Sequence, residues 1–195
     1  DFRKTMDEVI EDVRIICKAS TCSVLLTDFK ERTCSILTCA RRQDMPPLDL
    51  DRVFNNEYIY IAESWIETLK GSNCLIIQND ADMEIIRQRN PNWHKTMMEA
   101  GVKSLVLLPL THNNEFVGFI WATNFDTSRV LHIKETLELV TFFIASEVAS
   151  YKLVQRLRFL SNEDLLTGVN NRNAMNNRVL QFVSGEVNYR TISVV

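Results

Sequence analysis

Residues 100–125 read AGVKSLVLLPLTHNNEFVGFIWATNF and carry the clearest strand pattern in the chain. Two runs within them, 105–111 and 115–125, are rich in Val, Leu, Ile and aromatic residues, and the polar residues 112–114 separate the runs. Apolar runs of this length on either side of a short polar turn are typical of an antiparallel hairpin. The middle of the chain is therefore predicted to be antiparallel sheet.

The segments on either side of this hairpin complete an α+β fold. A second pair of runs rich in Val, Ile, Leu and Thr flanks a polar turn near the N-terminus and predicts another hairpin. Apolar residues at helical spacing predict helices around both hairpins. The predicted order is helix 2–16, strands 22–29 and 33–40, helix 58–69, strand 74–77, helical segments 83–100, strands 105–111 and 115–125, and a long helix from 131 to about 160. Hairpins with helices at both ends indicate an antiparallel sheet flanked by helices.

Particular residues are expected to fix the ends and faces of these helices. Asp80 or Asp82 would cap the helical segment that begins at Met83, and Asn92 would cap the turn after Pro91. The apolar stripe of the first helix is Phe2, Met6, Val9, Val13 and Ile16. This stripe is expected to be the buried face of the first helix.

The long C-terminal helix is apolar on two sides. One seam contains Leu137, Val140, Ile144, Val148 and Tyr151, and the other contains Leu139, Phe143, Leu153, Leu157 and Leu160. One seam is expected to pack on the sheet and the other to meet the same helix of a second subunit. Leu153, Leu157 and Leu160 lie beyond the stretch that a compact domain could cover, so they are the predicted interface of a parallel homodimer.

Composition and charge exclude several classes of function. The 195 residues carry a net charge of -3, which argues against nucleic acid or an anionic membrane as partner, because such surfaces need an excess of Lys and Arg. No apolar run approaches the ~20 residues of a membrane helix, and no signal peptide is visible. The five cysteines, without a Cys-x-x-Cys pair, are expected for a reducing compartment. A cytoplasmic protein without membrane insertion is therefore predicted.

Residues 164–172 read DLLTGVNNR and resemble the opening motif of GGDEF diguanylate cyclase domains. The matching positions are Asp164, Leu166, Thr167, Gly168, Asn171 and Arg172, and the departures are Val169 and Asn173. The resemblance implies that an incomplete GGDEF domain begins here. In that family the metal-binding carboxylate and the signature hairpin lie further downstream, so no catalytic residue and no metal ligand can be assigned. The chain itself is expected not to make cyclic di-GMP.

Residues 1 to about 160 resemble the GAF family of sensory domains. Residues 100–110 are similar to the family's Gly-x-x-Ser-Leu-x-x-x-Pro-Leu strand, residues 117–118 supply the Val-Gly pair of the next strand, and the order of the elements agrees. The resemblance implies a small-molecule pocket between the sheet and its covering helices, although many members serve only as dimerising modules. The predicted domains are a sensory domain at 1–150, a coiled-coil-like linker helix at 151–163 and the start of a GGDEF domain at 164–195.

The resemblance places the candidate pocket beneath the segment 58–101. The candidate ligand-binding residues are Trp65, Asp80, Trp93, His94, Met97, Trp121 and Thr123. Aromatic side chains with a few polar groups are typical of a small-ligand site, and equally of an ordinary core. His94 could bind haem iron but stands alone, and Cys74 could attach a bilin but its position in a strand favours burial. Residues 124–126 match only part of the pattern of members that bind cyclic nucleotides, because the Lys is missing. The sequence therefore leaves the cofactor unknown.

Three hypotheses for function stay open. The first is a cytoplasmic sensory module that binds a small molecule and regulates a C-terminal diguanylate cyclase, and so cyclic di-GMP signalling, through a dimeric helix. The second is a dimerisation scaffold without a ligand. The third is a redox or metal sensor based on Cys17, Cys22, Cys34 and Cys39. Catalysis by the sensory domain itself is not expected, because the histidines fit no known catalytic motif.

Overall fold

The computed structural model describes residues 2–45, 57–69, 71–113, 115–162 and 169–184. The chain divides into two compact units, Asp1–Ala149 and Ser150–Val195. The elements are α1 (Phe2–Cys17), β1 (Thr21–Asp28), β2 (Thr33–Arg41), α3 (Glu57–Leu69), β3 (Leu75–Ile77), α4 (Asp80–Arg89), α5 (Pro91–Glu99), β4 (Leu105–His112), β5 (Glu115–Thr123), the 3-10 turn η1 (Thr127–Arg129), α6 (Val130–Asn162) and α7 (Arg172–Val183). This order of helices and strands agrees with the order predicted from the sequence.

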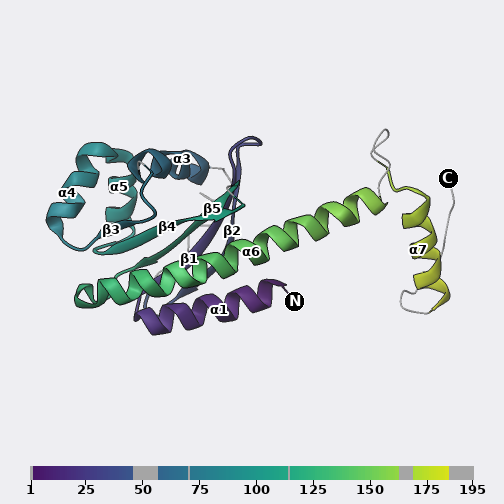
Figure 1. Ribbon diagram of the computed structural model, residues 1–195, viewed down its shortest axis with the longest axis horizontal. Helices are drawn as coiled ribbons and strands as arrows, with labels where there is room; N and C mark the ends of the chain where they lie inside the picture. The colour runs from purple at the N-terminus through teal and green to yellow at the C-terminus, as the bar shows by residue number, and fades with distance from the viewer. Residues whose placement is uncertain (1, 46–56, 70, 114, 163–168, 185–195) are drawn as a thin grey trace. The chain divides into compact units, whose positions relative to one another are not determined.

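The first unit is built on one five-stranded antiparallel sheet with the strand order β2-β1-β5-β4-β3. Both predicted hairpins form, because β1 pairs with β2 and β4 pairs with β5. β1 also pairs with β5, which joins the two hairpins and places Leu26 opposite Gly118. Figure 1 shows α1 and α6 on one side of the sheet and α3, α4 and α5 on the other. The predicted α+β fold with a long C-terminal helix is confirmed.

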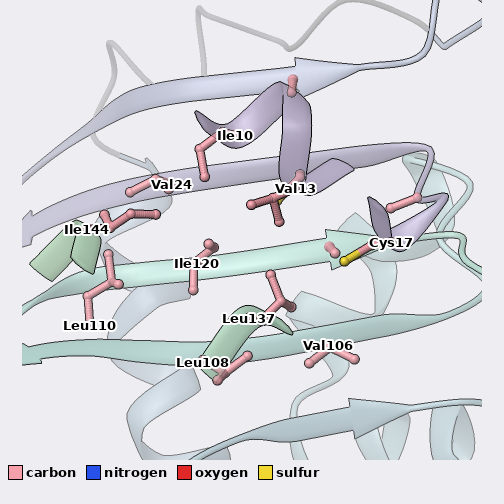
Figure 2. Close-up of a cluster of buried hydrophobic side chains, with 14 of the residues drawn as sticks. Ile10, Val13, Cys17, Val24, Val106, Leu108, Leu110, Ile120, Leu137 and Ile144 are labelled. Atoms are coloured by element: carbon pink, nitrogen blue, oxygen red, sulfur yellow. The ribbon is translucent and has the colours of Figure 1, made fainter. Parts of the chain in front are cut away.

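A continuous apolar core fills the face of the sheet beneath α1 and α6. Figure 2 shows Ile10 of α1 and both Leu137 and Ile144 of α6 among the strand side chains. Val24 of β1 and Ile120 of β5 lie in the same core, and all five side chains are fully buried. Burial contributes roughly 1.5–3 kcal/mol for each such side chain. This core therefore stabilises the packing of α1 and the first part of α6 on the sheet.

The buried stripe of α1 differs in part from the predicted stripe. Ile10 and Cys17 are buried, whereas Val9 is only partly buried and Ile16 is 50% exposed. Positions 6, 10, 13 and 17 face the sheet with helical spacing, and this set satisfies the periodicity as well as the predicted set does. The choice between two neighbouring stripes depends on how α1 packs on β1 and β2.

The second predicted seam of α6 is exposed. In the first unit Leu139 and Phe143 are 77% and 44% exposed, and in the second unit Leu153 and Leu157 are 58% and 56% exposed. The side chain of Leu160 lies outside the described residues. The sheet therefore covers one of the two apolar sides of α6, as expected from the sequence.

The N-terminus of α4 differs from the prediction. Asn79 is the cap, and its side-chain oxygen accepts a hydrogen bond from Asp82 N at 3.0 Å. The expectation that Asp80 or Asp82 caps a helix beginning at Met83 is wrong, because α4 begins three residues earlier and both aspartates lie in its first turn. Negative charge is stabilising at that position of a helix without acting as a cap.

The second unit contains the end of α6 and helix α7. Asn171 caps α7, since its side-chain oxygen accepts a hydrogen bond from Ala174 N at 3.1 Å, and its Nδ2 donates to Ser161 O at 2.8 Å. Arg172 is the exposed first residue of α7. The remaining residues of the GGDEF-like motif, Asp164, Leu166, Thr167 and Gly168, lie outside the described residues. Within the described parts of both units, no helix is long and apolar enough to cross a bilayer.

Gly118 allows β5 to approach β1 closely. A bulge interrupts the pairing of β5 with β4 here, because Gly118 lies opposite Leu110 whereas Phe116 lies opposite Thr111. Gly118 has a φ of 156°, and a Cβ atom at this position would lie 2.0 Å from Leu25 O of β1. Glycine is therefore required by contact with the neighbouring strand.

Replacement of Gly118 by Ala is expected to lower the free energy of unfolding by at least about 2 kcal/mol, because the added methyl group must displace β1 or β5. Urea unfolding followed by tryptophan fluorescence measures this loss. Gly71→Ala is the matched control, since Gly71 has a φ of 80° but nothing lies within 4 Å of an added Cβ. The control is expected to lose about 1 kcal/mol. Equal losses in both variants would show that the contact with β1 is not the constraint.

Candidate ligand-binding site

Asn90 holds together the helices that cover the second face of the sheet. It is the cap of α5, where its side-chain oxygen accepts a hydrogen bond from Trp93 N at 3.2 Å, and Pro91 is the first residue of the helix. Its Nδ2 donates to Ser64 Oγ of α3 at 2.7 Å. The predicted cap, Asn92, is wrong, because a proline without an N–H is best placed in the first turn and leaves the preceding residue as the cap. One buried amide therefore joins α3 to α5.

Trp65 of α3 lies at the centre of an aromatic cluster between α3, α5 and β5. Its ring centroid is 5.6 Å from that of Trp93 and 5.6 Å from that of Trp121, and its edge contact with Phe119 has a centroid distance of 4.9 Å. Trp65 and Phe119 are 4% and 0% exposed. The three tryptophans identified in the sequence therefore meet through Trp65.

Further aromatic residues that the sequence pattern did not single out extend this cluster. Phe119 lies two residues before Trp121, so the alternation of a strand would have placed both on one face. Phe116 reaches the same face because the bulge at Gly118 shifts the alternation, and its ring centroid is 4.8 Å from that of Phe119. Phe29, next to β1, is 5.4 Å from Phe116. A row of aromatic rings thus crosses this layer from α5 to the β1–β2 turn.

The other predicted ligand-binding residues lie in several places. Met97 of α5 is buried in the same cluster as Trp65. Thr123 is buried at the end of β5, where its hydroxyl shares a hydrogen bond of 2.6 Å with that of Thr21. Asp80 is exposed at the start of α4, and His94 is half-buried on α5. The structure thus brings the tryptophans and Met97 together, and a ligand role for each predicted residue stays a prediction.

Asn124, at the start of the segment 124–126 that a cyclic nucleotide would need, has a structural role. Its side-chain oxygen accepts a hydrogen bond from Lys103 N at 2.7 Å, and its Nδ2 donates to Gly101 O at 2.9 Å. Its φ of 54° is a left-handed conformation that Asn adopts more readily than most residues. Beside it, Phe125 N donates to Ser104 Oγ at 3.1 Å. These bonds tie the end of β5 to the start of β4, so the fold already uses the Asn124 amide.

Two of the cysteines proposed for a sensor, Cys17 and Cys22, offer little reactive thiolate. Burial raises the pKa of Cys17 to about 11, and it also raises the pKa of Cys22. Because the thiolate is the nucleophile and the metal ligand, both thiols are expected to be inert. Cys74 packs against the core beneath α1 and α6, on the other side of the sheet from Trp65, so its expected place in the pocket is wrong. In the described part of the chain, no three His, Cys, Asp or Glu side chains are grouped as a metal site requires.

Two surface depressions lie away from the aromatic cluster. One is lined by Asp7, Glu11, Thr38, Cys39, Ala40, Arg41 and Gln43. The other is lined by Ser20, Arg42, Met45, Glu99, Ala100, Gly101, Lys103 and Asn124. Neither lining includes a predicted ligand-binding residue, so both are separate from the candidate site.

Comparison with known proteins bears on the first unit. A family model described as the GAF domain matches residues 1–149, and no curated protein matches the chain. The phycocyanobilin-bound GAF domain from a cyanobacterial phytochrome has a TM-score of 0.57 at 14% identity, over 78% of this chain and 87% of that chain. The GAF domain of a phosphoenolpyruvate-protein phosphotransferase from Coxiella burnetii has a TM-score of 0.54 at 10% identity, over 80% and 87%. At such identities the structural similarity concerns the fold.

Replacement of Asn90 by Ala is expected to lower the free energy of unfolding by about 1–2 kcal/mol, because it removes both the cap of α5 and the hydrogen bond to Ser64. Unfolding in urea, followed by tryptophan fluorescence, measures the loss. Asn92→Ala is the matched control: Asn92 is exposed two residues further along α5, and a change within about 0.5 kcal/mol is expected. A larger loss in the control than in Asn90→Ala would contradict the assignment of the cap.

Proposed function

Because the chain belongs to the GAF family of sensory domains over residues 1–149, we propose that it binds a small molecule beneath α3 and α5 and transmits the binding along α6. In this proposal the receiving part is a diguanylate cyclase domain that begins at residue 164, so the chain regulates cyclic di-GMP signalling. The sensory domain has no catalytic activity of its own, and it acts in the cytoplasm.

The continuity of α6 is the observation that carries this proposal. Leu137 and Ile144 are fully buried in the sensory core, and the same helix continues to Asn162, just before the GGDEF-like motif. The helix contains no Gly or Pro, the residues at which helices most often bend sharply. Packed cores transmit displacement because they have little free volume. A change in the sensory core would therefore reach the following domain through α6.

The exposed seam of α6 supports a dimeric helix. Leu139, Phe143, Leu153 and Leu157 follow heptad spacing, and their side chains are 44% or more exposed. A row of large apolar side chains on a helix surface is typical of an interface. Joining two GTP molecules requires two cyclase domains that face each other. A parallel pair of α6 helices would control how those two domains are aligned.

A dimerisation scaffold without a ligand is the second candidate. Trp65, Trp93 and Phe119 are each 4% exposed or less, which is also what an ordinary core requires.

A cysteine-based sensor has less support, because it conflicts with the raised pKa values of Cys17 and Cys22. A bilin linked through Cys74 conflicts with the position of that residue on the opposite side of the sheet.

A ligand retained by the native chain tests the sensory function. Native mass spectrometry of the chain, purified without denaturant, is expected to detect a bound small molecule. Trp93→Ala is expected to lose this molecule and to keep the oligomeric mass, because Trp93 lies on the opposite side of the sheet from α6. Met98→Ala, on the same helix but 46% exposed, is the control and should retain it. If no molecule is found and Trp93→Ala unfolds the chain, the scaffold hypothesis is correct.

Replacement of both Leu153 and Leu157 by Glu is expected to convert dimers into 22.6 kDa monomers with a folded sensory domain, because like charges would meet across the helix pair. Light scattering at low concentration measures the mass, and tryptophan fluorescence checks the fold. Leu131→Glu is the control, since Leu131 is 72% exposed on α6 but lies outside the heptad positions. A fusion of residues 1–163 to an active GGDEF domain should lose cyclic di-GMP synthesis with the double replacement. A double variant that remains dimeric rules out this seam.

A further inference from the structure

Two buried polar atoms on the second face of the sheet have no hydrogen-bond partner. They are Nε1 of Trp65 and Oγ1 of Thr27, and no other buried side-chain nitrogen or oxygen in the described ranges is unpaired. Both side chains are 4% exposed. A buried polar group without a partner is destabilising, and native proteins contain few of them. The presence of two in one layer requires an explanation.

Thr27 faces the same layer as Trp65. It lies two residues after Leu25 in β1, and Leu25 belongs to the core around Trp65. Directly opposite Thr27 on β2 is Cys34, which also packs against this core. Partners across an antiparallel pair direct their side chains to one face. Both unpaired groups therefore lie between the sheet and its covering helices.

The two groups define the polar contacts that a ligand could make. An indole N–H only donates, so Trp65 requires an acceptor, whereas the Thr27 hydroxyl can donate or accept. The hydrophobic side chains that pack against this core and stay partly exposed include four aromatic or aliphatic residues and one cysteine: Phe29, Cys34, Ile36, Phe116 and Trp121. Such surroundings suit a flat, mainly apolar molecule.

The described side chains supply no buried charge to this layer. No charged side chain is buried among the described residues. Arg32, in the β1–β2 turn, forms an ion pair of 3.3 Å with Glu63 of α3 and lies 5.1 Å above the ring of Tyr60. An ionised ligand in the layer would lack a counter-charge, and burial of an unpaired ion is costly. The bound molecule is therefore expected to be uncharged.

We propose that Trp65 and Thr27 are the polar contacts for an uncharged, flat, mainly apolar ligand, in which one atom accepts a hydrogen bond from Trp65 Nε1 and a second polar atom pairs with Thr27 Oγ1. This inference rests on the proposed sensory function and adds the chemical class of the ligand. Neither atom is reached by solvent, so the aromatic cluster must move when the ligand enters. Entry of the ligand and displacement of the core are then one event.

Quinoline and naphthalene test the role of Trp65, because they share a shape and differ in one ring nitrogen that accepts a hydrogen bond. Calorimetric titration of the chain, in a buffer where quinoline is uncharged, is expected to show about tenfold tighter binding of quinoline. In Trp65→Phe the two affinities should agree within about twofold. Met98→Ala is the control and should keep the tenfold preference, because Met98 lies on α5 but is 46% exposed and is not among the residues proposed to surround the ligand.

The unaltered chain provides the same test if Trp65→Phe does not fold. Quinoline, but not naphthalene, is expected to move the indole N–H resonance of Trp65 downfield, with the assignment taken from Trp93→Phe and Trp121→Phe. Equal affinities for the two probes would overturn the role of Trp65. A preference for quinoline that persists in Trp65→Phe would also overturn the role of Trp65. So would a preference for quinoline that leaves the indole N–H resonance of Trp65 unchanged.

Thr27→Val tests the second contact, since valine has the shape of threonine without the hydroxyl. The melting temperature of the unliganded chain is expected to stay constant or to rise. Thr68→Val is the matched control, because Thr68 is 8% exposed and its hydroxyl donates to Ser64 O at 2.7 Å. The control should melt about 2–4 °C lower. An equal fall in Thr27→Val would show that the Thr27 hydroxyl is already bonded and would overturn its role.

The two proposals fail in distinguishable ways. If native mass spectrometry finds a charged ligand, or finds any ligand while neither probe binds, the ligand class is wrong and the sensory function stands. If no ligand is found and neither probe binds, both proposals are wrong.

Discussion

The sheet buries large apolar side chains on both of its faces, and the need to cover both faces determines the arrangement of the other elements. Val24 and Ile120 face α1 and α6, whereas Leu25 and Phe119 face α3 and α5. Neither face is stable in water, because burial of each such side chain contributes roughly 1.5–3 kcal/mol. One sheet therefore carries helices on both sides. Gly118 makes this possible, since it allows the two hairpins to join along β1 and β5.

The two faces of the sheet differ in chemistry. The core beneath α1 and α6 consists mainly of aliphatic side chains, and neither of the unpaired buried polar atoms found in the described residues lies in it. The layer beneath α3 and α5 contains a row of aromatic rings together with the unpaired groups of Trp65 and Thr27. The first arrangement suits a permanent support, and the second suits a site whose packing changes on binding. The sheet thus separates the supporting face from the face proposed to bind ligand.

The separation of the two faces determines how ligand binding could affect α6. The proposed ligand layer and α6 lie on opposite sides of the sheet, so a signal must pass through the strands themselves (Figure 1). Phe119 and Ile120 are neighbours in β5, and they contact the aromatic layer and the α6 core, respectively. A displacement of Trp65 against Phe119 would therefore move the strand on which α6 rests. In the proposed mechanism α6 follows such a movement, because the side chains that it buries on the sheet leave little free volume.

Local patterns in the sequence were sufficient to predict both hairpins, the helices and their order, because the periods of strands and helices involve only neighbouring residues. The three tryptophans of the aromatic cluster were identified through the resemblance to the GAF family. Other features became apparent only in the tertiary structure. These are the close approach at Gly118, the bulge that turns Phe116 inward, the link that Asn90 makes to α3, the side of the sheet that Cys74 occupies, and the unpaired hydroxyl of Thr27. Each of them depends on contacts between segments far apart in the chain, and such contacts produce no periodic pattern in the sequence.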